Sequence, residues 1–341
     1  MSARNMAKRT AAGTLALAVC LTGGAVALAG AANADANFKF DQRIAGDDRY
    51  QTAIAASKAA FPDAGKTENV VLVNGFATVD GLTASYLAGV ANAPILYVSD
   101  KGADADTKAE IKRLGAKNVW LVGGTTVIPA SVETAIKGDG YSVTRINGSD
   151  RYETAQLIAE AGTKIAGKKP AKVFVASGTS FADALAVSPI AYAKGYAIAL
   201  TEKDSTSDYT KKELGNIGSD TKILVGGTAV VSEKVAKDLT VSERVAGDDR
   251  AVTANLVSDW AKKSEGFNKA NAALVGGTNG NGADSLVASA LGAKSLTTLH
   301  FAGWDATYTY FKDHAAELTG KGFVFGGKAA VPGDQVDKAQ A

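Results

Sequence analysis

One eleven-residue motif occurs three times along this chain at nearly equal intervals. It reads RIAGDDRYQTA at Arg43–Ala53, RINGSDRYETA at Arg145–Ala155 and RVAGDDRAVTA at Arg244–Ala254. Two further landmarks keep step with it: an aspartate that opens DGL, DAL or DSL, and a pair of glycines that follows an apolar run. Self-similarity at a fixed period indicates an internal duplication. The chain is therefore expected to fold as three copies of one module.

The apolar pattern of the first repeat predicts an α/β module. Its short apolar runs at 70–73, 95–98 and 119–122 are continuous rather than alternating, which is typical of strands buried on both faces. The segments expected to be helices are 49–60, 80–91, 104–114 and 129–136. This alternation predicts a mostly parallel sheet with helices on both of its faces.

A strand-like segment precedes each copy of the motif, and this sets the expected boundaries of the repeats. They fall at 37–137, 138–237 and 238–341, with the third repeat the most divergent. The linkers are too short for independent movement, so we expect three packed units in one rigid body. A pseudo-threefold arrangement is the simplest way to bury equivalent faces of three similar units.

The first 34 residues have the features of a secretory signal peptide. Three basic residues precede an apolar stretch, and Ala32-Asn33-Ala34 provides a site for cleavage after Ala34. Removing this segment changes 37 Lys+Arg against 35 Asp+Glu into 34 against 35. The mature chain is thus nearly neutral, which argues against a nucleic-acid partner, and no membrane contact is expected after cleavage.

Cysteine and histidine are too scarce to support metal or redox chemistry. Cys20 is the only cysteine and would leave with the signal peptide. The two histidines, His300 and His314, both belong to the third repeat, and their separation is not a helical ligand spacing. We therefore expect ordinary surface or core histidines, no metal site and no cofactor.

The repeated motif contains helix caps and arginines. Asp48 and Asp150 stand where a helix N-cap belongs, each followed three residues later by Gln or Glu. The arginines either pair with acidic groups of the protein or hold an anionic ligand at a helix N-terminus. Those before the turn are Arg43, Arg145 and Arg244, and those after it are Arg49, Arg151 and Arg250.

A second group of candidate residues follows the strands of the predicted sheets, where ligands gather in parallel α/β folds. Asp80, Asp183 and Asp284 are either helix caps or ligands to a hydroxyl-rich polymer. The paired-glycine loops could bring backbone N–H groups to an anion, but they lack the lysine of a P-loop. No Ser-His-Asp set or paired-carboxylate motif recurs with the repeats, so no catalytic residue is assigned.

Together, the R-[IV]-x-G-x-D-R-Y-x-T-A motif, the F-x-D-A-L motif and the V-G-G-T loop resemble the cell wall-binding repeat 2 family. This family occurs as three tandem copies on surface proteins of Gram-positive bacteria, and the resemblance covers about Phe38 to Val336. It implies three Toprim-like α/β modules that form one unit at the cell surface. It also implies non-covalent attachment to an anionic wall polymer, either teichoic-acid-like or a secondary wall polysaccharide.

The resemblance also frames the alternatives. The family normally joins this unit to an effector domain, whereas the three repeats take up residues 35–341 here, so we expect an anchor unit without a catalytic domain. An amidase-like wall hydrolase and a self-assembling surface-layer subunit are the other candidates, and other surface proteins are possible partners. The third repeat has Ala251 in place of the motif tyrosine and carries the insertion NGNGAD, so structural closure is the role it suggests.

Overall fold

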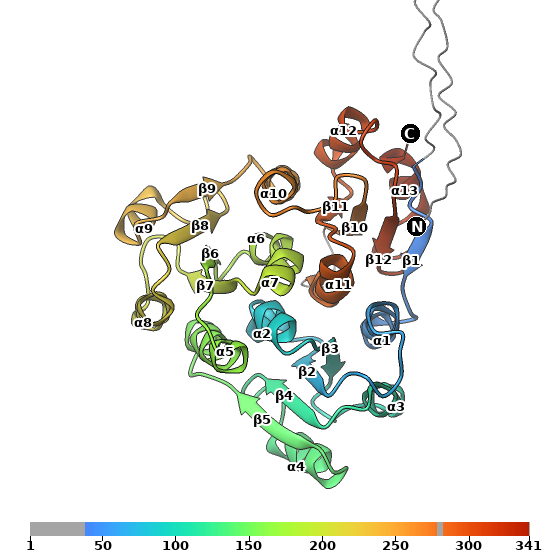
Figure 1. The fold of residues 1–341 in the computed structure, drawn as a ribbon, viewed down its shortest axis with the longest axis vertical. Coiled ribbons are helices and arrows are strands. Elements are labelled where there is room, and N and C mark those ends of the chain that lie inside the picture. Colours follow the sequence, from blue (N-terminus) through green and yellow to red (C-terminus); the bar gives the residue numbers. More distant parts are fainter. Residues whose placement is uncertain (1–37, 278–281, 341) are drawn as a thin grey trace, which may run out of the picture. The chain divides into compact units, whose positions relative to one another are not determined.

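The structure is a computed structural model that describes residues 38–277 and 282–340. The predicted signal peptide, with Cys20, lies outside these residues, as does part of the NGNGAD insertion. Within the described ranges, no helix combines the length and the apolar character needed to cross a membrane. The described residues form three four-stranded parallel sheets with helices between and around them (Figure 1). The expected mixed α/β fold with three parallel-sheet modules is confirmed.

The first sheet has the strand order β3-β2-β4-β5, and β2 and β3 are buried along almost their whole length. Its strands are β2 (Asn69–Asn74), β3 (Ile95–Val98), β4 (Asn118–Val122) and β5 (Ser142–Ile146). The helices of this part of the chain are α1 (Arg49–Ala60), the 3-10 helix η1 (Thr78–Gly81), α2 (Ala84–Val90), α3 (Ala105–Leu114) and α4 (Ala130–Gly138). The helix expected over 80–91 is therefore divided into a 3-10 turn and a short α-helix.

The second sheet repeats this order as β7-β6-β8-β9. Its strands are β6 (Lys172–Ser177), β7 (Ala197–Thr201), β8 (Thr221–Val225) and β9 (Glu243–Val245). The helices are α5 (Arg151–Ala166), α6 (Phe181–Ala186), α7 (Ser188–Lys194), α8 (Asp208–Ile217) and α9 (Glu233–Asp238).

The third sheet, ordered β1-β12-β10-β11, takes one strand from the start of the chain. Its strands are β1 (Gln42–Ile44), β10 (Ala272–Gly276), β11 (Leu299–Ala302) and β12 (Gly322–Phe325). The helices are α10 (Arg250–Ser264), α11 (Ala283–Lys294), α12 (Asp305–Asp313) and α13 (Gly333–Ala339). Gln42, Arg43 and Ile44 lie opposite Phe323, Val324 and Phe325 in register.

The sheets are offset from the sequence repeats by one strand. The strand just before the second motif, β5, completes the sheet of the first repeat, and β9 in the same way completes the sheet of the second. In the third sheet the equivalent place is taken by β1, the strand that precedes the first motif. Each copy of the motif thus links the last strand of one sheet to the first helix of the next module.

Helices α1, α2, α7 and α11 pack against one another between the sheets (Figure 1). The backbones approach closely at Gly89 in α2, where a Cβ atom would lie 2.3 Å from the carbonyl oxygen of Tyr192. Two buried tyrosines add hydrogen bonds between repeats: the Tyr97 hydroxyl donates to the Ala283 carbonyl at 2.6 Å, and the Tyr192 hydroxyl donates to the Ala93 carbonyl at 3.2 Å. The three modules therefore share a core.

Candidate functional site

The three helices that begin within the motif are capped by the same side chain. Asp48 has extended backbone dihedrals, and its carboxylate accepts a hydrogen bond from the Gln51 amide at 2.8 Å. Asp150 and Asp249 each accept two such bonds from the first turn of their helices. An N-cap satisfies amides that have no partner within the helix. The prediction that Asp48 and Asp150 cap helices is therefore confirmed.

The arginines before the turn act as clamps within the protein. Arg43 donates to the carbonyl oxygens of Gly326 at 2.7 Å and Val331 at 3.1 Å. Arg145 likewise donates to the Gly123 carbonyl at 2.8 Å, and its Nε lies 2.7 Å from a carboxylate oxygen of Glu133. Each clamp ties a sheet's last strand to the paired-glycine loop of the same sheet.

The third clamp follows this pattern. Arg244 donates to the carbonyl oxygens of Gly226 at 2.8 Å and Val231 at 3.0 Å, and it lies 3.1 Å from a carboxylate oxygen of Glu233. Every arginine of this set has at least two acceptors within the protein. The structure thus gives these three arginines a structural role, whereas the sequence left open whether they bind protein groups or a ligand.

The arginines after the turn are less occupied. Arg49 donates one hydrogen bond, to the Gly75 carbonyl at 2.6 Å. Arg151 and Arg250 make the equivalent bonds to Gly178 at 2.5 Å and Gly277 at 3.0 Å. A guanidinium has five N–H donors. Within the described residues no other hydrogen bond from these three side chains is found, so donors are left for a ligand.

Each of the three DGL-type aspartates faces the second arginine of the following repeat. Burial raises the pKa of Asp80, while Arg151 and the hydrogen bond from the Gly124 backbone oppose that rise. Burial likewise raises the pKa of Asp284, and Arg49 opposes it. An aspartate of repeat 1 thus faces an arginine of repeat 2, and an aspartate of repeat 3 faces an arginine of repeat 1.

Asp183 completes the set and is the most affected. It is 5% exposed, and burial raises its pKa to about 6, against the opposing effects of a hydrogen bond from Ser180 and the charge of Arg250. The structure therefore brings the nine candidate residues together at three junctions, which lie between repeats 1 and 2, between repeats 2 and 3, and between repeats 3 and 1.

The paired-glycine loops close around these aspartates. The first glycine of each pair, Gly123, Gly226 or Gly326, has a φ between 106° and 125°, which side-chain-bearing residues rarely adopt. A Cβ atom on Gly226 or Gly326 would lie 2.6 or 2.5 Å from the carboxylate of Asp183 or Asp284. The sequence suggested that the paired-glycine loops could bind an anion. The carboxylates against which Gly226 and Gly326 pack belong to the protein itself.

A cavity of about 270 Å³ opens at the junction between the third and the first repeat. It is bordered by the N-terminus of α1, by the paired-glycine loop after β12 and by the start of α11. Its polar lining comes from Asp47, Asp48, Arg49, Thr52 and Asp284. A second cavity, of about 360 Å³, is lined by Arg250 and by residues after β6 and β10. Both cavities place a motif arginine at the wall.

An exposed aromatic side chain beside Arg49 was missed by the sequence reasoning. Phe76 is 64% exposed, and the Arg49 guanidinium carbon lies 4.3 Å from the centre of its ring. An apolar residue within the polar loop NGFATVDGL was the signal that could have revealed it. The pair forms a flat cationic and aromatic surface at the first repeat.

The divergent third motif keeps its packing with a different residue. In the first two repeats, Tyr50 and Tyr152 cover Gly75 and Gly178. In the third, where Ala251 replaces the tyrosine, the indole nitrogen of Trp304 would lie 2.8 Å from a Cβ on Gly277. The loop that binds Arg250 is thus covered by the side chain of Trp304, the N-cap residue of α12.

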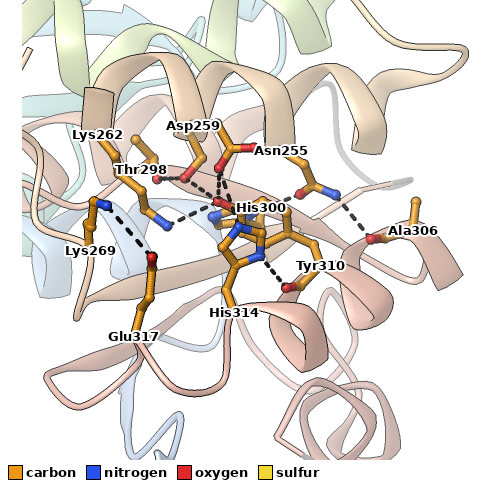
Figure 2. A network of polar contacts seen from close by, with 11 residues as sticks. Asn255, Asp259, Lys262, Lys269, Thr298, His300, Ala306, Tyr310, His314 and Glu317 are labelled. Carbon is orange, nitrogen blue, oxygen red and sulfur yellow. Dashed lines mark hydrogen bonds and ion pairs between the residues drawn. The ribbon is translucent and has the colours of Figure 1, made fainter. Parts of the chain in front are cut away.

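The two histidines belong to a polar network between α10, β11 and α12 (Figure 2). His300 is fully buried, and its Nδ1 lies 2.8 Å from the side-chain oxygen of Asn255, whose amide nitrogen donates to the Ala306 carbonyl. Burial lowers the pKa of His300 well below its usual value, so its ring is neutral. His314 stacks on Tyr310 with 4.1 Å between ring centres. Across the described residues, no three metal-ligating side chains come together.

Comparison with known proteins agrees with this repeat organisation. N-acetylmuramoyl-L-alanine amidase LytC of Bacillus subtilis is 35% identical over 217 residues, which are 63% of this chain and 42% of LytC. The amidase enhancer of the same organism is 32% identical over 272 residues, or 79% of this chain and 36% of that protein. This chain therefore spans less than half the length of either relative.

Among solved structures, Cwp6 from Clostridium difficile superposes with a TM-score of 0.76 at 27% sequence identity, covering 88% of this chain and 47% of Cwp6. The cell wall binding domain 2 (CWB2) family matches three segments of the chain, 43–133, 145–236 and 244–336, as the resemblance in the sequence predicted. Each matched segment begins at one of the clamp arginines. This chain belongs to the cell wall binding domain 2 family and carries three copies of its domain.

Proposed function

We propose that this chain is a secreted, non-catalytic protein that attaches non-covalently to an anionic polymer of a Gram-positive cell wall. Membership of the family supports the cell wall as the partner. The observation that carries the proposal is the threefold repetition of one junction, in which a guanidinium with unused donors stands at a helix N-terminus. Phosphate and carboxylate groups suit such a position because the N–H donors and the helix dipole both favour negative charge.

The junction also offers groups for a polymer's hydroxyls. Aspartate oxygens accept hydrogen bonds from hydroxyl groups, and Asp284 lines the same cavity as Arg49. The exposed ring of Phe76 gives a sugar unit an apolar face to contact. We assign the charged groups of the polymer to Arg49, Arg151 and Arg250, and its hydroxyls to the aspartates.

The finer architecture forms part of the proposal. We infer a Toprim-like module and a pseudo-threefold relation between the three copies. The cyclic facing of Asp284 with Arg49, Asp80 with Arg151 and Asp183 with Arg250 supports this relation. Three weak sites on one body would bind a repeating polymer far more strongly than one site.

The test is a pull-down of the purified protein with Gram-positive walls before and after chemical removal of their anionic polymers. Binding is expected to the intact walls and to be lost from the stripped walls. It should also weaken as salt rises, because exposed charges are screened over about 10 Å at 0.1 M. Undiminished binding to stripped walls would overturn the proposal.

A double variant, Arg49→Gln with Arg151→Gln, locates the site. It should bind walls at least tenfold more weakly under conditions in which circular dichroism shows that it is still folded, although the loss of the bonds to Gly75 and Gly178 lowers its melting temperature. The matched control removes two charges elsewhere, Lys117→Gln with Lys234→Gln, at side chains that are each 70% exposed. If the arginine variant unfolds before it loses binding, these arginines are structural joints, and the search moves to the Asp80 and Gly123 loops.

A further inference from the structure

A cavity of about 300 Å³ lies between α5 and α8 of the second repeat, away from the three junctions. Its polar lining comes from the side chains of Gln156, Glu160, Thr163, Lys164, Glu213 and Asn216. Glu213 is 1% exposed, and neither of its carboxylate oxygens has a hydrogen-bond partner in the part of the chain that the structure describes. The side-chain oxygen of Gln156, also 1% exposed, is equally unpartnered there. A buried acceptor without a donor is costly and rare.

The first repeat has a glutamate at the position equivalent to Glu213, and there the glutamate is paired with an arginine. Glu213 and Glu110 each lie six residues after the N-cap of their helix, Ser207 or Asp104. Glu110 is as deeply buried as Glu213, but it receives donors. The Nε and Nη2 atoms of Arg113 lie 2.7 and 2.8 Å from its two oxygens.

Further bonds fix the same guanidinium in the first repeat. The Ser57 hydroxyl donates to Glu110 at 2.5 Å, and Arg113 also donates to the carbonyl oxygen of Phe61 at 2.8 Å. A buried carboxylate is thus paired in two planar hydrogen bonds with an arginine of its own helix, the geometry that guanidinium suits best.

The second repeat lacks both donors. Asn216 stands three residues after Glu213, where the first repeat has Arg113, and Ala159 stands eight residues into the motif helix, where the first repeat has Ser57. The position that corresponds to Phe61 is Thr163, which lines the cavity. The cavity therefore occupies the place that Arg113 fills in the first repeat.

In the third repeat a tyrosine stands at the position equivalent to Glu213, and its hydroxyl group is hydrogen-bonded within the protein. Tyr310 stands six residues after the N-cap Trp304, and its hydroxyl lies 3.3 Å from Ser258 and 2.6 Å from the carboxylate of Asp259 (Figure 2). Lys262 donates to the same hydroxyl at 3.0 Å. Of the three equivalent positions, the one in the second repeat is left with an unpartnered carboxyl group.

The buried groups of the lining that have no partner among the described residues are acceptors, whereas the one cation of the lining, Lys164, is exposed. Glu160, at its edge, already accepts from the amides of Gln156 and Asn216 on one oxygen, at 2.7 and 3.1 Å. This leaves the Gln156 oxygen and both oxygens of Glu213 buried beside the cavity without a donor among the described residues. A guanidinium offers five donors and no acceptor, and it matches the flat geometry of a carboxylate.

We propose that the cavity between α5 and α8 is a binding site for a guanidinium group supplied from outside the chain, as on an arginine side chain. Glu213 pairs with the guanidinium as Glu110 pairs with Arg113, and the Gln156 oxygen accepts a further N–H. The ligand's methylene groups contact Ala159 and Ile217, the apolar residues of the lining. This site is independent of wall attachment, which uses the junctions.

Binding is tested by calorimetry and by thermal shift with N-acetyl-L-arginine amide as the probe. Saturable binding and a rise in melting temperature are expected, because a ligand that binds only the folded state stabilises it. The citrulline analogue, equal in shape but uncharged, should bind at least tenfold more weakly. Methylguanidinium tests the head group alone: equal affinity indicates a small guanidino compound as the natural ligand, and much weaker affinity indicates an arginine within a polypeptide.

Two variants make the assignment specific. Glu213→Gln should abolish probe binding, and Asn216→Arg should also abolish it, while raising the melting temperature, by placing an internal guanidinium where the first repeat has one. The converse change, Arg113→Asn, should create a second site of similar affinity. Binding that persists in the Asn216→Arg protein, equal binding of citrulline, or no saturable binding to the unmodified protein would each overturn the proposal.

Discussion

Arg43 donates a hydrogen bond of 2.7 Å to the carbonyl oxygen of Gly326, which lies in the last sheet near the other end of the described chain. The two residues follow the same plan as Arg145 with Gly123 and Arg244 with Gly226, which are close in sequence. One local device is therefore used a third time to join the first strand to the last module. Within the motif, the arginine before the turn therefore has a structural role, whereas the arginine after the turn has N–H donors without a partner among the described residues.

Replacing Arg43 by Gln should destabilise the protein without altering the junction's ligand groups. The loss of two hydrogen bonds from a charged donor to carbonyl oxygens is expected to cost about 2–4 kcal/mol of unfolding free energy. Urea denaturation measures this cost. Arg49→Gln, which breaks one such bond, serves as the comparison and should cost clearly less; equal losses would remove the distinction between clamp and site arginines.

Replacing Asp150 by Ala should lower stability through the loss of a helix cap. The carboxylate of Asp150 accepts from the amides of Tyr152 and Glu153, both at 2.8 Å. The expected cost is about 0.5–2 kcal/mol, measured by thermal or urea unfolding. Asp204, an exposed loop residue, provides the control, and its change to Ala should have almost no effect. Wall binding by the folded Asp150 variant should stay close to that of the unmodified protein.

Two glycine-to-alanine changes are expected to act in opposite directions. Gly326 has a φ of 106°, and a Cβ there would lie 2.5 Å from the Asp284 carboxylate, so Gly326→Ala should strongly destabilise the protein or prevent folding. Gly215, inside α8, has open space at its Cβ position, and Gly215→Ala should add about 0.5–1 kcal/mol. Differential scanning calorimetry compares the two melting temperatures, and a harmless Gly326→Ala would contradict the packing described here.

The buried carboxyl of Asp183 should make stability depend on pH. Its pKa rises from 3.8 to about 6 on folding, so the native state binds the proton more tightly than the unfolded state. Stability should therefore fall as pH rises from about 4 to about 6 and change no further above that. Because one pKa unit corresponds to about 1.36 kcal/mol, the whole effect is about 3 kcal/mol.

The Asp183→Asn variant lacks this titration and should gain on the unmodified protein across the same window. Urea unfolding at pH 4, 5, 6 and 7 gives the difference in unfolding free energy between the two proteins. Asp248→Asn, an exposed change in the turn before the third motif helix, controls for the general effect of removing a charge. A difference between Asp183→Asn and the unmodified protein that stays constant from pH 4 to 7 would show that Asp183 titrates normally.

Local patterns in the sequence were enough to predict the elements of each module. The apolar run 95–98 is strand β3, the segment 49–60 is α1, and Asp48 caps that helix as expected. These features depend on periodicity and on side chains within one or two turns, which the sequence displays directly. The threefold period then extended them to the whole chain.

Relations between repeats could not be obtained in this way. Nothing in the spacing of Asp284 indicates that it faces Arg49, because strand order and helix packing place them together over a long sequence separation. The cavity beside Glu213 exists because the second repeat has neither an arginine in place of Arg113 nor a serine in place of Ser57. This difference can be recognised only when the two repeats are compared in space. Phe76 was missed for a related reason: exposure is a property of the folded surface.

The pairing of β1 with β12 has a consequence for the order of synthesis. The ribosome makes β1 before any other described strand, but its partner is among the last to emerge. The first two sheets can be completed as soon as β5 or β9, at the start of the following repeat, has been synthesised. The third sheet is completed only when β12 pairs with β1, which was synthesised first. A chain carrying two repeats would bring a different edge to β1, and a fourth would have to enter between β12 and β1. Gaining or losing one copy would therefore give β1 a partner strand from a different repeat, and the packing between repeats would have to change to bring that strand beside β1.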